Sequence, residues 1–441
     1  MKVIHAVFAL IVIAFISCKQ EPYVETAAIA NAENFHNSVK NLTDIIVHDI
    51  LSPPVASRIY AYPTIAAYEV LSQNHPNYSS LAGQLNDLTE APKADTSTQI
   101  SYSLAAIHAF NVIGKQLTFS EDKYDNYTTQ LYDSLQSIGI PKQVFNESIA
   151  FGESVAKHIS DWASKDNYHQ TRSFPKFSIK RDPERWKPTP PGYMDGIEPH
   201  WRDIRPFALD SSQQFVPAPP TAFNTDKNSL FYKETMEVYS VVNNGTEEQK
   251  EIASFWDCNP YVLNVTGHVM FATKKITPGG HWMGIVGLAS RKAEADLMKS
   301  VEAYALTSIA LADAFISCWD EKYRSNLTRP ETVINEYFDE EWVPLLQTPP
   351  FPEHTSGHSV ISRAAAIALT SIYGDNFSFD DTTEVEFGLP MRSFSSFIHA
   401  SEEAAVSRLY GGIHFRPAID EGVKQGEAVG RFVVDKLKLR K

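Results

Sequence analysis

The sequence is poor in cysteine and in basic charge, and each shortage excludes a class of protein. Three cysteines in 441 residues are too few for a disulfide scaffold. The 39 lysine and arginine residues are outnumbered by 53 aspartate and glutamate residues, which gives a formal net charge of −14. Because no basic surplus is left to neutralise phosphates, we expect no nucleic-acid partner. Beyond residue 18 we also find no apolar run typical of a membrane span, which argues against an integral membrane protein.

The N-terminus has the pattern of an export signal. Lys2 precedes the apolar run VIHAVFALIVIAFIS, which is broken only by His5 and is followed by Cys18. A short charged start before an apolar core of this length is typical of a signal peptide, here residues 1–18. The end of the run, FISC, resembles a bacterial lipobox, so we expect a lipoprotein anchored at Cys18; a plain secretory signal is the alternative. In both cases we expect export to the cell envelope, with membrane contact only through the anchor.

The remaining sequence divides into a tether and one folded body. Residues 19–35 are polar and rich in alanine, as a tether would be. Residues 36–441 show helical spacing of apolar residues, without sustained strand-like alternation, and predict one all-α domain, a large helical bundle. Its first half, 36–245, contains residues 170–222, whose density of proline and tryptophan predicts an ordered loop that wraps the body.

The second half of the domain, 246–441, is predicted to be helical to its end, with one break at the glycine and proline residues of 277–282. Residues 295–323 have the clearest amphipathic stripe of the chain. Cys258 and Cys318 lie in this half and are expected to be buried free thiols, with a bridge between them as the alternative.

Three polar clusters in this half could carry chemistry. Taken singly, each has an ordinary explanation as solvated charges, a helix cap or a structural histidine. In chain order they are Lys322 with Arg329 and Pro330, then Thr355-Ser356-Gly357-His358, then Ser407-Arg408 with His414.

Together the clusters predict a receptor for a tetrahedral oxyanion. Prolines before the second cluster and helix formers after it place Ser356 and Gly357 at a helix N-terminus, where unpaired N–H groups favour an anion. Arg408 falls in the last turn of another predicted helix, with His414 just beyond it. Guanidinium and ammonium groups, a hydroxyl and helix-end amides are the donors that such an anion requires.

The three motifs, Lys-x6-Arg-Pro, Ser-Gly-His and Ser-Arg-x5-His, resemble those of the superfamily shared by vanadium-dependent haloperoxidases and type 2 phosphatidic acid or acid phosphatases. The stretches WKPTPP, PHWRDIRPF and GGIHFRPAIDEG are similar to bacterial vanadium haloperoxidases, and the resemblance covers nearly all of residues 40–441. Within that group the chain resembles most the iodide-oxidising enzymes of marine flavobacteria. The resemblance implies vanadate as the cofactor, which a phosphate-like oxyanion could replace, and a helical bundle of the haloperoxidase type.

The resemblance also implies roles for individual residues. His414 would be the axial ligand that bonds vanadium, and His358 the acid–base histidine. Lys322, besides binding vanadate, would polarise the bound peroxide during catalysis. The three cations that hold the cofactor oxygens would be Lys322, Arg329 and Arg408, with Ser356 and Gly357 as neutral donors. A wider shell on the halide side would contain Tyr261, Trp319, Asp320 and Phe351.

Some positions depart from the family pattern. Ala418 stands where the family commonly has an aspartate that orients the axial histidine, and Asp420 cannot be assumed to replace it. Thr355 stands in place of the usual proline, and His354 in place of a frequent tyrosine.

Two reactions fit such a cage, because vanadate and phosphate are isosteric. A haloperoxidase would oxidise a halide ion, iodide first and bromide second, with hydrogen peroxide to a hypohalous species. An acid phosphatase of the same superfamily would use His414 as a nucleophile and pass through a phosphohistidine. The long body and the tryptophan-rich loop are similar to haloperoxidases, which is the function that we predict.

Overall fold

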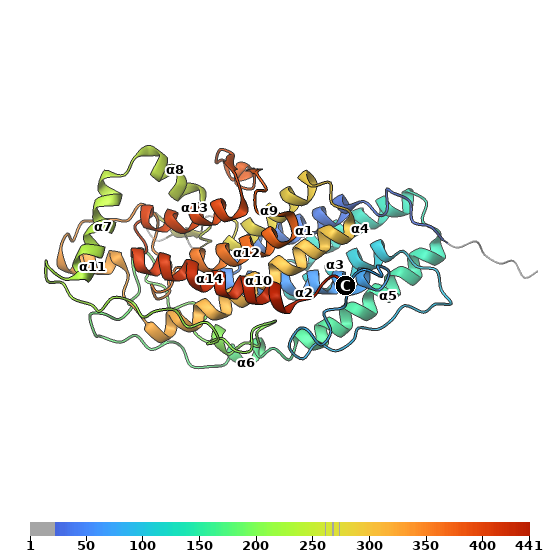
Figure 1. Ribbon diagram of the computed structural model, residues 1–441, viewed down its shortest axis with the longest axis horizontal. Helices are drawn as coiled ribbons and strands as arrows, with labels where there is room; N and C mark the ends of the chain where they lie inside the picture. Colours follow the sequence, from blue (N-terminus) through green and yellow to red (C-terminus); the bar gives the residue numbers. More distant parts are fainter. Residues whose placement is uncertain (1–22, 261, 267–268, 273) are drawn as a thin grey trace, which may run out of the picture.

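The computed structural model describes residues 23–260, 262–266, 269–272 and 274–441, and these residues form an elongated bundle of helices (Figure 1). The predicted all-α class is confirmed. The helices of the first half are α1 (Ala32–His48), α2 (Pro53–Ser72), α3 (Tyr102–Leu117), α4 (Glu121–Ser137), α5 (Lys142–Ala163) and α6 (Tyr168–Thr171), with the 3₁₀ turn η1 (Trp201–Asp203). Those of the second half are α7 (Leu230–Asn244), α8 (Glu247–Phe255), α9 (Pro278–Lys292), α10 (Leu297–Ser325), α11 (Pro330–Tyr337), α12 (Gly357–Tyr373), α13 (Phe397–Tyr410) and α14 (Arg416–Lys436), with η2 (Val385–Phe387).

Helix α10 is the central element of the bundle. It packs against α2, α9, α12 and α14, and every residue from Ser300 to Lys322 is buried. The prediction of an amphipathic helix at 295–323 was therefore wrong on one point, because partners surround the helix and leave no solvated face. By length and composition α10 could cross a membrane, but its whole apolar stretch is covered by the rest of the protein.

Helices α12 and α14 approach each other unusually closely because glycines recur on the facing side of α14. A Cβ atom on Gly426 would lie 2.1 Å from the carbonyl oxygen of Val360, and one on Gly422 would lie 3.0 Å from that of Ser356. Only a residue without a side chain allows this approach. The contact places the N-terminus of α12 beside the start of α14, which is where two of the predicted motifs meet.

The loop predicted at 170–222 is ordered and covers one side of the bundle. Residues 172–229 are irregular apart from η1, and they run along the lower edge of the molecule in Figure 1. Trp186 and Trp201 are both fully buried, which anchors the loop in the core. The buried carboxylate of Asp313 on α10 accepts hydrogen bonds of 2.7–2.9 Å from three backbone N–H groups of residues 207–209.

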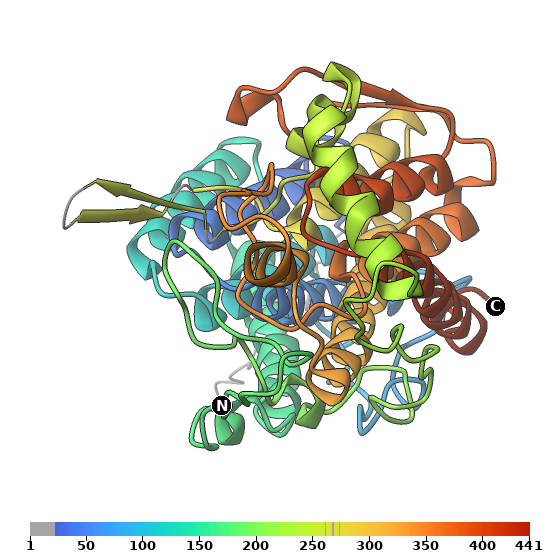
Figure 2. The ribbon, with the colours of Figure 1, turned by 90° about the vertical axis from the view of Figure 1, so that its left-hand side faces the viewer.

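Three details of the predicted organisation were wrong. The helical run to the C-terminus is interrupted by two antiparallel hairpins, β1 (Leu263–Thr266) with β2 (Val269–Ala272) and β3 (Phe379–Asp381) with β4 (Arg392–Phe394); the first projects from the body in Figure 2. The supposed break at 277–282 is the start of α9, which Thr277 caps. Helix α1 begins at Ala32, inside the supposed tether, because Phe35 is buried in the core.

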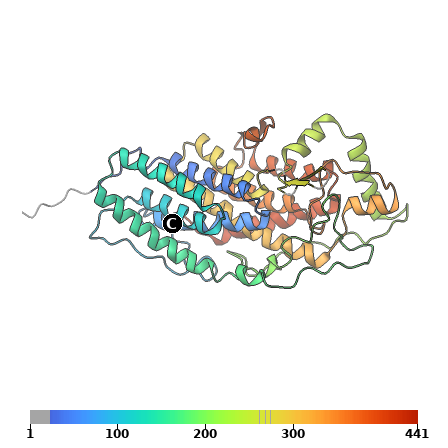
Figure 3. The same ribbon diagram turned by 180° about the vertical axis from the view of Figure 1, so that it is seen from behind.

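The helices of the two halves gather at opposite ends of the molecule. Seen from behind, α3, α4 and α5 form one end, whereas α7, α8 and α11 form the other (Figure 3). The three predicted motifs all come from the second half, so they meet toward the latter end.

Candidate active site

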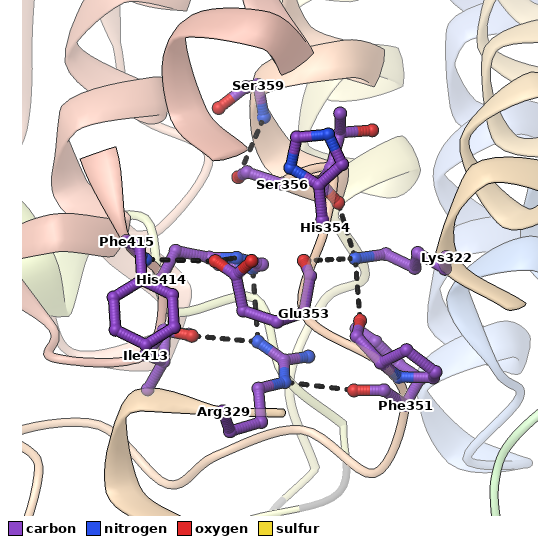
Figure 4. Close-up of polar contacts among 12 residues, drawn as sticks. Lys322, Arg329, Phe351, Glu353, His354, Ser356, Ser359, Ile413, His414 and Phe415 are labelled. Carbon is purple, nitrogen blue, oxygen red and sulfur yellow. Dashed lines mark hydrogen bonds and ion pairs between the residues drawn. The ribbon is translucent and has the colours of Figure 1, made fainter. Parts of the chain in front are cut away.

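The first motif residue, Lys322, lies in the last turn of α10 and is completely buried. Its ammonium group donates hydrogen bonds to three backbone oxygens, those of Pro352 at 3.1 Å, Glu353 at 3.1 Å and Thr355 at 2.5 Å. Burial lowers the pKa of Lys322 to about 8. The lysine therefore connects the segment before α12 to the central helix α10 and places a positive charge next to that segment (Figure 4).

Arg329 is the N-cap residue of α11 and is also fully buried. Its Nε donates to the carbonyl oxygen of Phe351 at 2.9 Å, and its Nη1 donates to that of Ile413 at 2.8 Å. The same Nη1 lies 3.2 Å from Nε2 of His414, whereas Nη2 has no partner among the described residues. One arm of the guanidinium group is thus left unpaired in the interior.

The second motif opens helix α12, as predicted. Ser356 is its N-cap, and its Oγ accepts a hydrogen bond of 3.4 Å from the N–H of Ser359, so the hydroxyl hydrogen is still available to a ligand. Thr355 has a structural role that the family's proline could not fill. Its hydroxyl donates to Gln425 at 2.6 Å, and Gln425 in turn donates to Ser317 at 2.9 Å, which links α12, α14 and α10.

His358 and Arg408 are both held by the backbone of Trp256. Arg408, in the last turn of α13, donates from Nη1 to the Trp256 carbonyl oxygen at 2.7 Å, and the ring of His358 hydrogen-bonds the same residue's backbone. The second arm of Arg408 lies 4.0 Å from the carboxylate of Asp257. Two polar atoms have no partner in the described part of the chain, Nε2 of His358 and Nε of Arg408. Burial and the charge of Arg408 hold the pKa of His358 well below its usual range, so the ring is neutral.

His414 is oriented by Glu353, a residue that the motif analysis missed. Its Nδ1 donates to Oε1 of Glu353 at 2.9 Å, and the same oxygen accepts a 2.9 Å hydrogen bond from the N–H of Phe415 (Figure 4). Burial and the nearby cations, Arg329 first among them, hold the pKa of His414 well below its usual range. The ring is therefore neutral, with its proton on Nδ1 and its lone pair on Nε2.

Glu353 takes the place of the aspartate that the family commonly carries where this chain has Ala418. Asp420 is exposed and cannot orient His414, whereas Glu353 is completely buried. Burial raises the pKa of Glu353 to about 7, against the opposing effect of Arg329 and Lys322. The sequence contained one signal for it, since Glu353 is an acidic residue just before the second motif, five positions before His358.

Residues of the second and third motifs line one small pocket. Trp319 and Phe351 form an aromatic wall, with ring centroids 5.0 Å apart. Asp320 does not reach the pocket, because its carboxylate points to the loop side and pairs with Arg324 at 3.1 Å. Tyr261 lies outside the described residues. The lining includes Trp319, Phe351, Gly357, His358, Arg408 and His414.

Comparisons with known proteins agree on the family. The family model of the VCPO second helical-bundle domain matches residues 302–440. A solved bacterial vanadium-dependent iodoperoxidase shares 54% sequence identity, with a TM-score of 0.89 over 96% of this chain and 99% of that chain. The chain belongs to the vanadium-dependent haloperoxidases.

More distant haloperoxidases share the fold alone. The holo form of a bacterial vanadium-dependent chloroperoxidase matches at a TM-score of 0.68 and 16% identity, over 88% of this chain and 93% of that one. Its apo form matches at a TM-score of 0.67 and 16% identity, over 88% of this chain and 95% of that one. No curated protein matches the sequence.

Membership of the haloperoxidases implies vanadate as the cofactor, and the residues present fit such an anion. A vanadate ion needs donors on several sides, and two buried guanidinium nitrogens in this region lack partners among the described residues, Nη2 of Arg329 and Nε of Arg408. These two nitrogens are free to donate to the oxygens of such an anion. The neutral His414 lines the same pocket with its lone pair on Nε2, the form that ligates a metal; in this structure that lone pair accepts from Nη1 of Arg329 at 3.2 Å.

Proposed function

We propose that this haloperoxidase oxidises iodide with hydrogen peroxide, as an exported enzyme anchored to the cell envelope through a lipid at Cys18. The observation that carries the halide assignment is the 54% identity, over almost the whole chain, to a protein described as an iodoperoxidase. Iodide is also the halide that is most easily oxidised. The reaction is X⁻ + H₂O₂ + H⁺ → HOX + H₂O, in which the halide is oxidised and the peroxide oxygen is reduced.

In this proposal the buried cations hold the cofactor. Arg408 lines the pocket and Arg329 adjoins it at His414, and each has one nitrogen without a partner among the described residues. Ser356 and the Gly357 amide add neutral donors at the N-terminus of α12. His414 ligates the metal through Nε2. Bound vanadate supplies the Lewis-acid centre at which hydrogen peroxide becomes susceptible to attack by halide.

Lys322 acts from behind the helix N-terminus. Its three hydrogen bonds to backbone oxygens hold the turn that carries Ser356 and Gly357, and its charge raises the positive potential at the pocket. In this structure its donors are occupied by those oxygens, so its polarising role toward peroxide is exerted through its field.

His358 moves the proton. The neutral ring lines the pocket, hydrogen-bonds the Trp256 backbone, and has an Nε2 without a partner among the described residues. It can therefore take a proton from incoming hydrogen peroxide and return one to the oxygen that leaves as water. The aromatic wall of Trp319 and Phe351 keeps the halide side apolar, which suits a large and weakly hydrated anion such as iodide.

One assay tests the reaction. Purified apo-protein is titrated with vanadate, and peroxide-dependent oxidation of iodide, bromide and chloride is measured beside hydrolysis of a phosphomonoester. We expect oxidation that depends on vanadate, with kcat/KM highest for iodide. Phosphate release without halide oxidation at any vanadate concentration would overturn the proposal in favour of the phosphatase.

The roles of the two histidines are tested by a matched pair of variants. We expect His414→Ala to abolish vanadate retention in equilibrium dialysis, because the metal loses its protein ligand. His358→Ala should retain vanadate but lose about 10²–10⁴-fold in kcat, the usual contribution of a general acid–base group. Equal loss of vanadate in both variants would contradict the assignment.

The export proposal rests on the sequence before residue 19 and has its own test. The full chain and a Cys18→Ala variant are expressed in a bacterial host and partitioned between detergent and water. We expect the wild-type protein in the detergent phase and the variant in the aqueous envelope fraction. Equal partitioning of the two proteins would remove the lipid anchor from the proposal.

A further inference from the structure

A second cluster of ligating side chains lies directly beside the pocket. Cys258 follows α8, His281 lies in the first turn of α9, and Glu384 immediately precedes η2. All three side chains are buried, and His281 is completely so. Nothing in the haloperoxidase reaction described above uses them. From their geometry we propose that they bind a divalent transition metal ion, zinc, that is separate from the vanadate site.

The distances among the three ligand atoms carry the proposal. Nδ1 of His281 lies 3.1 Å from Oε1 of Glu384 and 3.4 Å from Sγ of Cys258, and Sγ lies 3.6 Å from Oε1. With zinc bonds of about 2.0–2.3 Å, tetrahedral angles put pairs of N, O and S ligands about 3.4–3.6 Å apart. The three atoms therefore occupy three corners of a tetrahedron to within a few tenths of an ångström.

Without a metal, hydrogen bonds join the same three atoms, because Oε1 of Glu384 can accept from both the Cys258 thiol and the Nδ1–H of His281. A ring nitrogen has a single hydrogen or a single lone pair, which can point well at one partner. Here Nδ1 of His281 faces a thiol and a carboxylate at once, while these two face each other. A shared cation at the centre satisfies all three atoms together.

The surroundings of His281 add an independent feature of metal sites. Its other nitrogen, Nε2, lies 2.8 Å from the carboxylate of Asp381, which is also completely buried. A metal-ligating histidine almost always donates its second N–H to such a partner, which fixes the tautomer and orients the lone pair toward the metal. A sulfur, a nitrogen and a carboxylate oxygen together suit zinc, and a fourth position remains for water.

The proposed metal site supports the catalytic pocket through one short segment. Trp256 stacks on the His281 ring, with centroids 4.6 Å apart and planes 14° apart, and its carbonyl oxygen holds Arg408. Cys258 itself lines the pocket. A metal bound to Cys258 and His281 would therefore hold residues 256–258 in place. Both His358 and Arg408 hydrogen-bond the backbone of this segment, at Trp256.

The metal content of the protein tests the proposed zinc site directly, and the measurement needs neither vanadate nor an activity assay. The wild-type protein is produced in medium containing zinc, dialysed, and measured by inductively coupled plasma mass spectrometry. We expect about one zinc ion per chain, because a closed site with protein ligands retains its metal. Absence of zinc, together with no thiolate-to-cobalt charge-transfer band when the protein is refolded with Co²⁺, would overturn the proposal.

Variants test the ligand assignment. Cys258→Ser and Glu384→Gln are expected to lose the zinc, whereas Cys318→Ser is the matched control because Cys318 is the other buried free thiol and should keep it. Zinc that remains in full in Cys258→Ser would refute the site even if the wild-type protein contains metal. If a variant fails to fold, the cobalt spectrum of the wild-type protein still decides between a thiolate ligand and none. Because no readout involves vanadate, failure here leaves the haloperoxidase proposal untouched.

Discussion

The substitution Glu353→Gln isolates the charge that orients His414. Oε1 of Glu353 accepts hydrogen bonds from Nδ1 of His414 and from the N–H of Phe415, and a glutamine oxygen in the same place can keep both. What is lost is the negative charge that makes His414 a better ligand. Removing such a partner of a metal-bound histidine costs about 10–100-fold in affinity or activity, or ~1.4–2.7 kcal/mol. We expect vanadate affinity to fall within this range.

Equilibrium dialysis against vanadate measures the effect, and pH distinguishes it from a structural defect. The pKa of Glu353 is raised to about 7, so its carboxylate is ionised above that pH and becomes protonated as the pH falls through it. Wild-type affinity should therefore decline below about pH 7, and the decline attributable to this group should be missing in Glu353→Gln. Asp420→Asn is the control, because Asp420 is exposed and should change neither affinity nor profile. Unaltered affinity in Glu353→Gln, or an equal loss in Asp420→Asn, would refute the reasoning.

The remaining predictions concern packing and charge elsewhere in the bundle. Gly426→Ala should lower the free energy of unfolding by about 1–3 kcal/mol or more, because its Cβ would overlap a carbonyl oxygen of α12. Gly279→Ala, in open space, should be neutral or stabilising; equal melting temperatures in the two variants would contradict the close-packing argument. Lys322 has a pKa lowered to about 8 and loses its charge above that value, so vanadate affinity should fall as pH rises through 8. Dialysis should show that Lys322→Met binds vanadate more weakly than the wild-type protein and lacks the decline in affinity above pH 8. An identical decline in the variant and the wild-type protein would exclude the lysine as its cause. Asp166→Ala removes the buried partner of Arg58, which lies at 2.6 Å, and should lower the free energy of unfolding in denaturant by about 3–5 kcal/mol. A decrease of less than ~1 kcal/mol would mean that solvent takes the place of Asp166 beside Arg58.

Much of the fold was readable from the sequence because it depends on local patterns. Helical spacing predicted an all-α body for residues 36–441, and prolines followed by helix formers located the start of α12 at Ser356 and Gly357. The two hairpins were missed because each strand has only three or four residues, too few for alternation to stand out from the surrounding pattern. The burial of α10 on every side was missed for another reason. Periodicity shows which face is apolar, whereas the number of neighbouring helices depends on the whole packing.

For the site, the sequence alone predicted which residues carry the chemistry, and only the tertiary structure decided how they are paired. Spacing identified Lys322, Arg408 and His414 as one family's motifs, because a motif conserves the order of side chains along the chain. Spacing could not show that Glu353 replaces the aspartate that is missing at Ala418. Glu353 and His414 are far apart in sequence, and they meet only where α12 packs on α14. The cluster of Cys258, His281 and Glu384 is of the same kind, because its members come from three separate elements. Contacts between distant segments are set by packing, and no local pattern encodes them.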